Sequence, residues 1–354
     1  MKGRICIFLL IVLLAGSVFA QQSFISGSAL RPAPTSVKAF GYWPVRLIFS
    51  DDVDAFMDPN DYRTLSFDSF FAEVQASRFG GQTPQGQPFA GLAGGFAKNF
   101  GPVYASIFFE GSGNDLGFGD NNSLAVLIGT GSFGAFKPFF IKDAVSTQFG
   151  LGWGMNFAAG SGLLKPEVML SFSNAESIGE YDGVINLGAA LGIDFAPAGG
   201  EASLDIQYEL KFGIPENSGF YHDHFATVMY RRLYDLNSDL RAGWGFGGIG
   251  KLASQKNADT MVYYLDPLVN AGFKYRLGEV FGVNGQLVLR YTTLHNEDPA
   301  AGNESYFGGF RLEPIIGGTF SPYENLNIEL SVSAPRSLNN LDFLSVNFLA
   351  SFKK

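Results

Sequence analysis

The sequence predicts an all-β protein, a transmembrane antiparallel β-barrel of about 14–16 strands. One observation is that apolar residues occupy alternate positions over many segments of about ten residues, the length that a tilted strand needs to cross a bilayer. The other is composition. Of the 354 residues, 46% are hydrophobic and only 16% are charged, against about 25% charged residues in soluble domains.

Residues 1–20 are predicted to be an export signal. Lys2 and Arg4 precede the apolar run 5–14, and the segment 18–20 supplies the small residues of a cleavage site. The alternative is an N-terminal membrane anchor, but this run is short for a helix that spans a bilayer. We therefore expect the mature chain to begin after Ala20.

Charge and cysteine content exclude several functions for the mature chain. The net charge of −9 becomes −11 once Lys2 and Arg4 leave with the signal, and an acidic chain is not expected to bind nucleic acid. The single cysteine, Cys6, lies within the signal. The mature chain therefore has no disulfide and no thiolate ligand, and we expect no cofactor.

The segment Val145–Phe157 shows the alternation most clearly. It contains Gly-x-Gly-x-Gly, which resembles part of a nucleotide-binding loop. However, Gly150, Gly152 and Gly154 share one face of a predicted strand, because successive side chains in a strand point to opposite sides. Trp153 and its apolar neighbours share the other face. We therefore interpret the segment as a barrel strand with its glycines inward.

The same alternation recurs along the chain, in residues 185–195, 202–212, 240–246, 261–275, 283–291, 306–316, 326–332 and 344–352. Two predicted strands fit less well, because 135–141 contains Pro138 and 225–233 has poor periodicity. Pro267 and Pro314 fall inside strands, where each removes one backbone donor, so we expect them at bulges or strand ends.

The connections predict the orientation of the barrel. If the last strand runs toward the periplasm, the periplasmic turns are short, at 159–162, 196–200, 234–238, 277–281 and 321–324, and most opposite connections are longer. This is the pattern of the bacterial outer membrane. The last strand ends on Phe352, as C-terminal insertion signals of that membrane do, although Lys353 and Lys354 follow it. We expect outer-membrane lipid and the barrel assembly machinery as partners.

Charged residues on the inward parity are the candidate functional residues, because a charge facing lipid is costly. They could line a wet pore and set its selectivity, or form an internal salt-bridge network. A lumen of 14–16 strands is too wide for side chains alone to fill, which favours a channel, open or plugged. The predicted lumen residues are Glu167, Asp194, Asp205, Glu209, Lys211, Arg241, Asp266, Lys274, Arg290, Arg311, Glu313 and Glu329.

Other motifs have weaker chemical interpretations. The segment 129–134 matches Gly-x-Gly-x-x-Gly, but the residues after it have no helical period, so no helix would meet a pyrophosphate. His222 and His224 could hold a metal or lie in a solvated loop. His295 follows a strand end without a paired serine motif. We therefore assign no catalytic, cofactor or metal site.

The segment before the first strand lacks alternation. Residues 50–71 are acidic and aromatic, and Asp58-Pro59-Asn60 stands where FadL-type fatty-acid transporters carry Asn-Pro-Ala. Here the chain resembles that family, although two of the three motif positions depart. The resemblance implies that residues 21–60 form a hatch inside a barrel of residues 61–354. The alternatives are a periplasmic segment, or an extra strand in 38–49.

The predicted function is an outer-membrane channel or transporter for passive uptake of small solutes, which would be hydrophobic if the chain works like FadL. An alternative is a barrel without transport that acts as an adhesin or structural protein through its loops. A third is an outer-membrane hydrolase, since barrel enzymes do not reveal their sites as local motifs.

Overall fold

The computed structural model describes Phe56 and most of the chain from Asp68 onward. The described residues are 56, 68–79, 89–114, 121–142, 146–175, 181–197, 200–215, 221–255, 260–298, 303–333, 336–337 and 343–353. Among them, no helix is long and apolar enough to cross a membrane. The predicted signal, and the predicted hatch apart from Phe56, lie outside the described residues.

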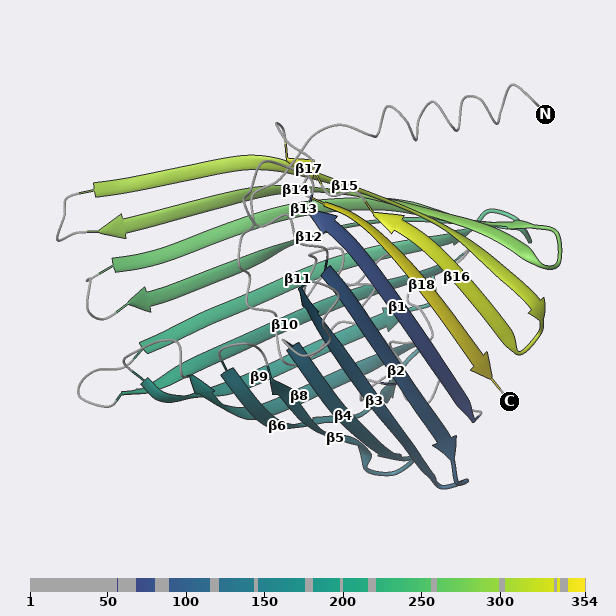
Figure 1. Ribbon diagram of the computed structural model, residues 1–354, viewed down its shortest axis with the longest axis horizontal. Helices are drawn as coiled ribbons and strands as arrows, with labels where there is room; N and C mark the ends of the chain where they lie inside the picture. The colour runs from purple at the N-terminus through teal and green to yellow at the C-terminus, as the bar shows by residue number, and fades with distance from the viewer. Residues whose placement is uncertain are drawn as a thin grey trace.

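The strands form one closed antiparallel sheet (Figure 1). It closes because β1 pairs with β2 on one side and with β18 on the other. The strands are β1 (Ser69–Phe79), β2 (Phe89–Asn99), β3 (Val103–Asn114), β4 (Asn121–Thr130), β5 (Gly134–Lys142), β6 (Ser146–Gly154), β7 (Phe157–Ala159), β8 (Gly162–Ala175), β9 (Tyr181–Phe195), β10 (Gly200–Pro215), β11 (Tyr221–Asp235), β12 (Leu240–Gln255), β13 (Thr260–Leu277), β14 (Phe281–Asp298), β15 (Asn303–Tyr323), β16 (Leu326–Ser333), β17 (Arg336–Ser337) and β18 (Phe343–Lys353).

Two of these 18 strands are short continuations of a longer neighbour. β7 pairs with β8, as β6 does, and β17 pairs with β15 beyond the end of β16. Sixteen strands therefore make up the wall of the barrel. This confirms the predicted transmembrane barrel and corresponds to the upper end of the predicted strand number.

Both of the poorly fitting predicted strands are present, as β5 and β11. The alternation is obscured in β11 because large apolar residues also face inward. Phe225 and Met229 are 5% and 1% exposed on the inner side, whereas Val228 is 46% exposed on the outer side. An inner face that is itself apolar removes the contrast on which a period of two depends.

The prolines lie within strands rather than at bulges or strand ends, which corrects the prediction. Pro267 lies in a gap at 265–267, where β13 is not paired with β14. Pro314 lies in a gap at 313–314, between the part of β15 that pairs with β16 and the part that pairs with β17. The register is the same on both sides of each gap. Pairing of β4 with β5 similarly skips Pro138. A proline has no amide hydrogen to donate, so the ladder is interrupted only on one side.

The two faces of the wall differ as predicted, and β6 illustrates the difference. Phe149 and Leu151 face outward and are 58% and 51% exposed, and Gly150 and Gly152 face inward. A Cβ at Gly150 would overlap the ring of Phe139, which also faces inward from β5. The glycine therefore lets a large inner side chain lie flat against the neighbouring strand.

The two ends of the barrel also differ. The connections 100–102, 131–133, 160–161, 196–199, 236–239, 278–280 and 324–325 are short and share one end. Outward aromatic residues gather near them, including Phe133, Phe281 and Tyr323, and the Trp153 Nε1–H donates to the Phe133 carbonyl at 2.8 Å. Such a girdle is typical of a membrane interface. At the other end, β13 and β15 (18 and 21 residues) exceed the length that a bilayer needs.

Candidate functional site in the barrel lumen

The structure places the predicted lumen residues on the inward-facing positions of their strands, which alternate with the exposed apolar residues of the outer face. Arg311 and Glu313 have this parity in β15, but their side chains lie outside the described ones. Glu209 is buried and Lys211 is half-buried, both on β10. The other residues of the predicted set fall into ion pairs, most of them buried, or into a cavity at one mouth of the barrel.

The most buried ion pair joins β13 and β14. The Arg290 Nε–H donates to Asp266 Oδ2 at 2.8 Å, and Arg290 Nη2 contacts the same oxygen. The two side chains are 1% and 0% exposed. Because both charges are removed from water, each depends on the other for its electrostatic stabilisation.

Three further predicted carboxylates pair with cations that the sequence reasoning missed. Glu167 lies 3.4 Å from Lys137 Nζ, and both side chains are fully buried. In the other two pairs the nitrogen–oxygen distance is 2.7 Å for Asp205 with Arg231 and 2.6 Å for Asp194 with Lys165. The inner wall therefore carries neutralised pairs, as the salt-bridge alternative requires. The inward parity of the three cations was a signal that could have found them.

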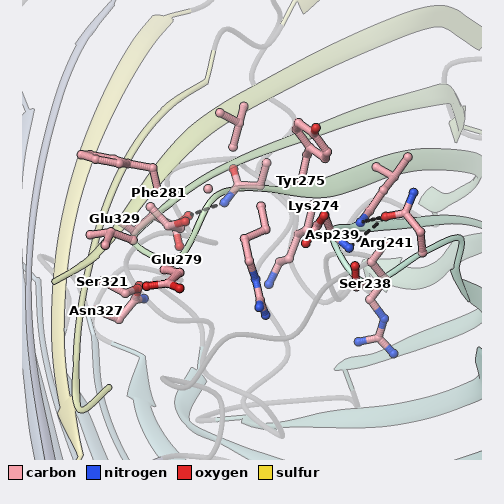
Figure 2. A pocket seen from close by; sticks show the side chains of 18 of the residues that line it. Ser238, Asp239, Arg241, Lys274, Tyr275, Glu279, Phe281, Ser321, Asn327 and Glu329 are labelled. Atoms are coloured by element: carbon pink, nitrogen blue, oxygen red, sulfur yellow. Dashed lines mark hydrogen bonds between the residues drawn. The ribbon is translucent and has the colours of Figure 1, made fainter. Parts of the chain in front are cut away.

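A polar cavity of about 650 Å³ lies at the end of the barrel with the short connections (Figure 2). We call it the mouth cavity. It is lined from β11 to β16, from β18 and from the connections 236–239 and 278–280. Its charged and amide side chains include Arg241, Lys274, Arg276, Glu279, Asn284 and Glu329. Three predicted lumen residues, Arg241, Lys274 and Glu329, are thus brought together by strands that are distant in sequence.

The groups of the mouth cavity are held in place by neighbouring strands. Arg241 pairs with Glu201 (Nη2–Oε1, 2.7 Å) and Asp235 (Nε–Oδ1, 3.1 Å). Lys274 lies directly opposite Arg241 in the register of β12 and β13. On β14, the amide of Asn284 donates to Glu329 Oε1 at 3.2 Å.

Charges of both signs line the mouth cavity. Figure 2 shows Lys274, Arg241 and Asp239 on one side, and Glu329 with Ser321 and Asn327 on the other. A charged solute between them would meet fixed charges of both signs, whose field is strengthened by the low-dielectric walls. This arrangement can discriminate solutes by charge and by dipole.

The inner face of β1–β9 also carries an apolar cluster. The cluster contains Phe56, Phe71, Ala93, Ala97, Tyr104, Phe108, Ala125, Leu127, Ala135, Phe139, Met169 and Ala190, with Leu349 from β18. The rings of Phe56 and Phe71 meet edge to face at 4.8 Å, and the Ser106 hydroxyl donates to the Phe56 carbonyl at 3.0 Å. Both partners face inward, so the chain at Phe56 lies inside the barrel.

The motifs with alternative chemical interpretations fall elsewhere. The segment 129–134 joins β4 to β5 through a tight connection, so a strand follows it. His224 Nδ1 lies 2.6 Å from the hydroxyl of the outward-facing Tyr208. The side chains of His222 and His295 are not among the described ones. Within the described part of the chain, no group of three or more potential metal ligands occurs.

The comparisons with known proteins support the fold of this chain and nothing beyond the fold. No family model matches the sequence, and no curated protein sequence is significantly similar to it. A bacterial polysaccharide outer-membrane secretin superposes with a TM-score of 0.50 and 6% identity, over 81% of this chain and 98% of that one. An anion-selective porin from Comamonas acidovorans gives a TM-score of 0.43 and 10% identity, over 81% and 98%. The outer-membrane channel DcaP of Acinetobacter baumannii gives 0.42 and 10%, over 81% and 96%.

The chain therefore has the fold of the bacterial outer-membrane β-barrels. Its closed wall, outward apolar band and aromatic girdle are those of a barrel that spans a membrane. The resemblance to FadL-type transporters stays a prediction.

Proposed function

We propose that the protein is a channel of the bacterial outer membrane that lets small polar solutes diffuse passively through its lumen. The observation that carries the proposal is the mouth cavity, a polar opening within a closed wall of sixteen strands. Barrels of that size enclose more space than their own side chains fill. The proposal includes insertion by the barrel assembly machinery, with Phe352 near the end of β18 as the terminal aromatic residue, and assigns no catalytic role.

The charges of the mouth cavity are expected to control ion selectivity. Replacing Lys274 and Arg276 together with glutamate changes the formal charge of the lining from −1 (three cations against four carboxylates) to −5 (one cation against six), at a place where the field is focused by the walls. We expect the ratio of potassium to chloride permeability to rise several-fold. The measurement is the reversal potential across a planar bilayer at about 0.1 M KCl, where the Debye length is about 10 Å.

Lys98→Glu is the matched control for this change. Lys98 lies on the outward side of β2, where it pairs with Asp68 at 2.7 Å and approaches the ring of Phe100. The same type of substitution there should leave the reversal potential unchanged. Equal shifts in the two variants would contradict a selective role for the mouth cavity. Complete absence of conductance would instead support the adhesin or structural alternative.

The proposal also assigns residues 21–60 to a hatch that narrows the lumen from its apolar side. Phe56 supports this assignment, because its ring is 2% exposed and packs on Phe71, and its carbonyl is held by Ser106. Solutes would then enter through the mouth cavity, whose polar lining comes mainly from β12–β16. The remaining residues of the hatch lie outside the described chain.

Loosening the contact of Phe56 should open the channel. Phe56→Ala removes a buried ring whose loss from a core costs about 3–5 kcal/mol, which weakens the attachment of the hatch. We expect more frequent large-conductance openings in single-channel records, and a higher steady conductance when 21–60 is deleted. Val346→Ala, an outward-facing truncation on β18, is the control and should not change the openings. A deletion variant with wild-type conductance would rule out the hatch.

A further inference from the structure

Four residues that line the mouth cavity form one row across four neighbouring strands. Arg276 of β13 is paired with Gly282 of β14, Gly282 with Thr319 of β15, and Thr319 with Glu329 of β16. Residues that are paired directly across strands point their side chains to the same face of the sheet. The row therefore has a cation at one end, an anion at the other and a hydroxyl between them. We call these four residues the charged row.

The middle of the charged row is low, because Gly282 has no side chain. A Cβ there would overlap the Thr319 hydroxyl, so the glycine lets this hydroxyl lie against the backbone of β14. The mouth cavity above the row measures about 650 Å³, which is within the range of small-molecule sites. A solute in the cavity can therefore lie across the row and contact both of its ends.

The anionic end of the charged row is held in a fixed position. The Asn284 amide donates to Glu329 Oε1 at 3.2 Å (Figure 2). It reaches across β15 because its paired residue there is Gly317, where a Cβ would overlap Asn284 Oδ1. Figure 2 shows Glu279 on the same side of the cavity. Within the described part of the chain neither carboxylate forms an ion pair, so this side presents negative charge to a solute.

The cationic end of the charged row is Arg276. Its backbone N–H donates to the Asp239 carbonyl at 2.7 Å, which fixes this end of β13 against the connection 236–239. The side chain is exposed in the cavity and forms no ion pair with the described residues. Arg241, in contrast, already pairs with Glu201 and Asp235. Arg276 is therefore a guanidinium that can bind a carboxylate of a solute through two parallel hydrogen bonds.

The length of the charged row indicates the length of the solute. Arg276 and Glu329 are three strand spacings apart, which is about 14 Å along the sheet. An ionic contact at each end takes up about 3–4 Å, which leaves about 6–8 Å between the two charged ends of a solute. The ammonium nitrogen and the carboxyl carbon are about 6 Å apart in an extended dipeptide but only about 2.5 Å apart in a single amino acid.

We propose that the charged row binds a short zwitterionic peptide as the peptide enters the lumen. The carboxylate of the peptide binds Arg276, its ammonium group binds Glu329, and its central peptide group meets the Thr319 hydroxyl, which can donate or accept. A solute with a single charge satisfies one end of the row and leaves the other end without a partner. This inference rests on the proposed channel function and names the class of solute.

Block of the KCl current by alanyl-alanine tests the proposal. The full-length barrel is reconstituted in planar bilayers at about 0.1 M KCl, and the concentration dependence of the block gives a dissociation constant. We expect alanyl-alanine to bind about five- to tenfold more tightly than N-acetyl-alanyl-alanine, which lacks the ammonium, and than alanyl-alanine amide, which lacks the carboxylate. Free alanine is too short to reach both ends and should bind as weakly as the singly charged derivatives.

Two substitutions distinguish the ends of the charged row. Arg276→Gln should weaken the binding of alanyl-alanine and of N-acetyl-alanyl-alanine, but not that of alanyl-alanine amide. Glu329→Gln should weaken the binding of alanyl-alanine and of the amide, but not that of the acetylated dipeptide. A general change in the shape of the mouth cavity would alter the binding of all three probes and would not produce this crossed pattern.

Lys98→Gln and Asp68→Asn are the matched controls. The two residues pair with each other at 2.7 Å on the outer side of the barrel, near the short connection 100–102. Each control removes a charge of the same sign as one of the test substitutions, but outside the lumen. Both should leave the three dissociation constants unchanged, and a heat-modifiable gel shift verifies that each variant has folded.

Two results would overturn the peptide site. One is equal affinity for alanyl-alanine and its two singly charged derivatives, and the other is an equal effect of Glu329→Gln on all three probes. Calorimetric titration of the detergent-folded barrel separates this failure from failure of the channel. A barrel without KCl conductance that still binds alanyl-alanine through Arg276 and Glu329 keeps the site and refutes the channel. A conducting barrel that does not bind alanyl-alanine does the reverse.

Discussion

Asp266→Ala should lower the free energy of unfolding of the barrel by about 3–5 kcal/mol. The substitution leaves the guanidinium of Arg290, which is 1% exposed, without the carboxylate that accepts its Nε–H at 2.8 Å. An unpaired buried charge keeps its desolvation cost and loses the Coulomb attraction that offset it. The effect can be measured by urea titration of the detergent-folded protein, with gel mobility of unheated samples reporting the folded fraction.

Two comparisons identify burial as the cause. Asp68→Ala breaks an ion pair of similar length with Lys98, but the side chains of that pair are 33% and 43% exposed, so the loss should stay below about 1 kcal/mol. The double variant Asp266→Leu/Arg290→Met removes both charges and should recover most of the stability. If Asp266→Ala cost no more than Asp68→Ala, the inner pair would have to be solvated.

Leu170→Arg should destabilise the folded barrel by about 2–4 kcal/mol in lipid vesicles. Leu170 is 55% exposed on the outer face of β8, between Leu151 of β6 and Leu187 of β9, which are also exposed. This is the apolar band that faces hydrocarbon, where a guanidinium loses most of its hydration. Denaturant titration of the vesicle-inserted protein measures the difference.

The same substitution near the girdle provides the control. Leu277 is 50% exposed at the end of β13, next to the connection 278–280, where an arginine side chain can reach water. Leu277→Arg should therefore cost about 0–1 kcal/mol. Because both leucines are similarly exposed in the isolated chain, equal costs would mean that the outer face does not meet a bilayer as described.

Much of the wall was predictable from the amino-acid sequence because side-chain direction in a strand depends only on position along that strand. The segment Val145–Phe157 shows this: its glycines face inward and Phe149 and Leu151 face outward in β6, as the alternation predicts. The prediction was weaker where both faces of a strand carry apolar residues, as in β11. The expected positions of the prolines were wrong, because a proline interrupts the pairing of its strand with only one of the two neighbours.

The candidate site was less predictable, because it depends on which strands become neighbours. Glu167 and Asp205 were recognised as inward charges, but their partners Lys137 and Arg231 lie in β5 and β11, the two strands with the weakest signals. The mouth cavity combines Lys274 with Glu329, which lie on β13 and β16 and meet only because the sheet curves and closes. The alternation of side chains shows whether a residue faces inward or outward, but it does not show which residues of other strands lie next to it.

The amino-acid sequence alone was sufficient for the class of fold, for the inner and outer faces of most strands and for the end with short turns. These features follow from local rules, since a pleated strand alternates its side chains whatever its neighbours are. The ion pairs, the mouth cavity and the position of Phe56 required the folded barrel. They depend on strand register and on closure of the sheet, which bring residues far apart in sequence within a few ångströms and exclude water from them.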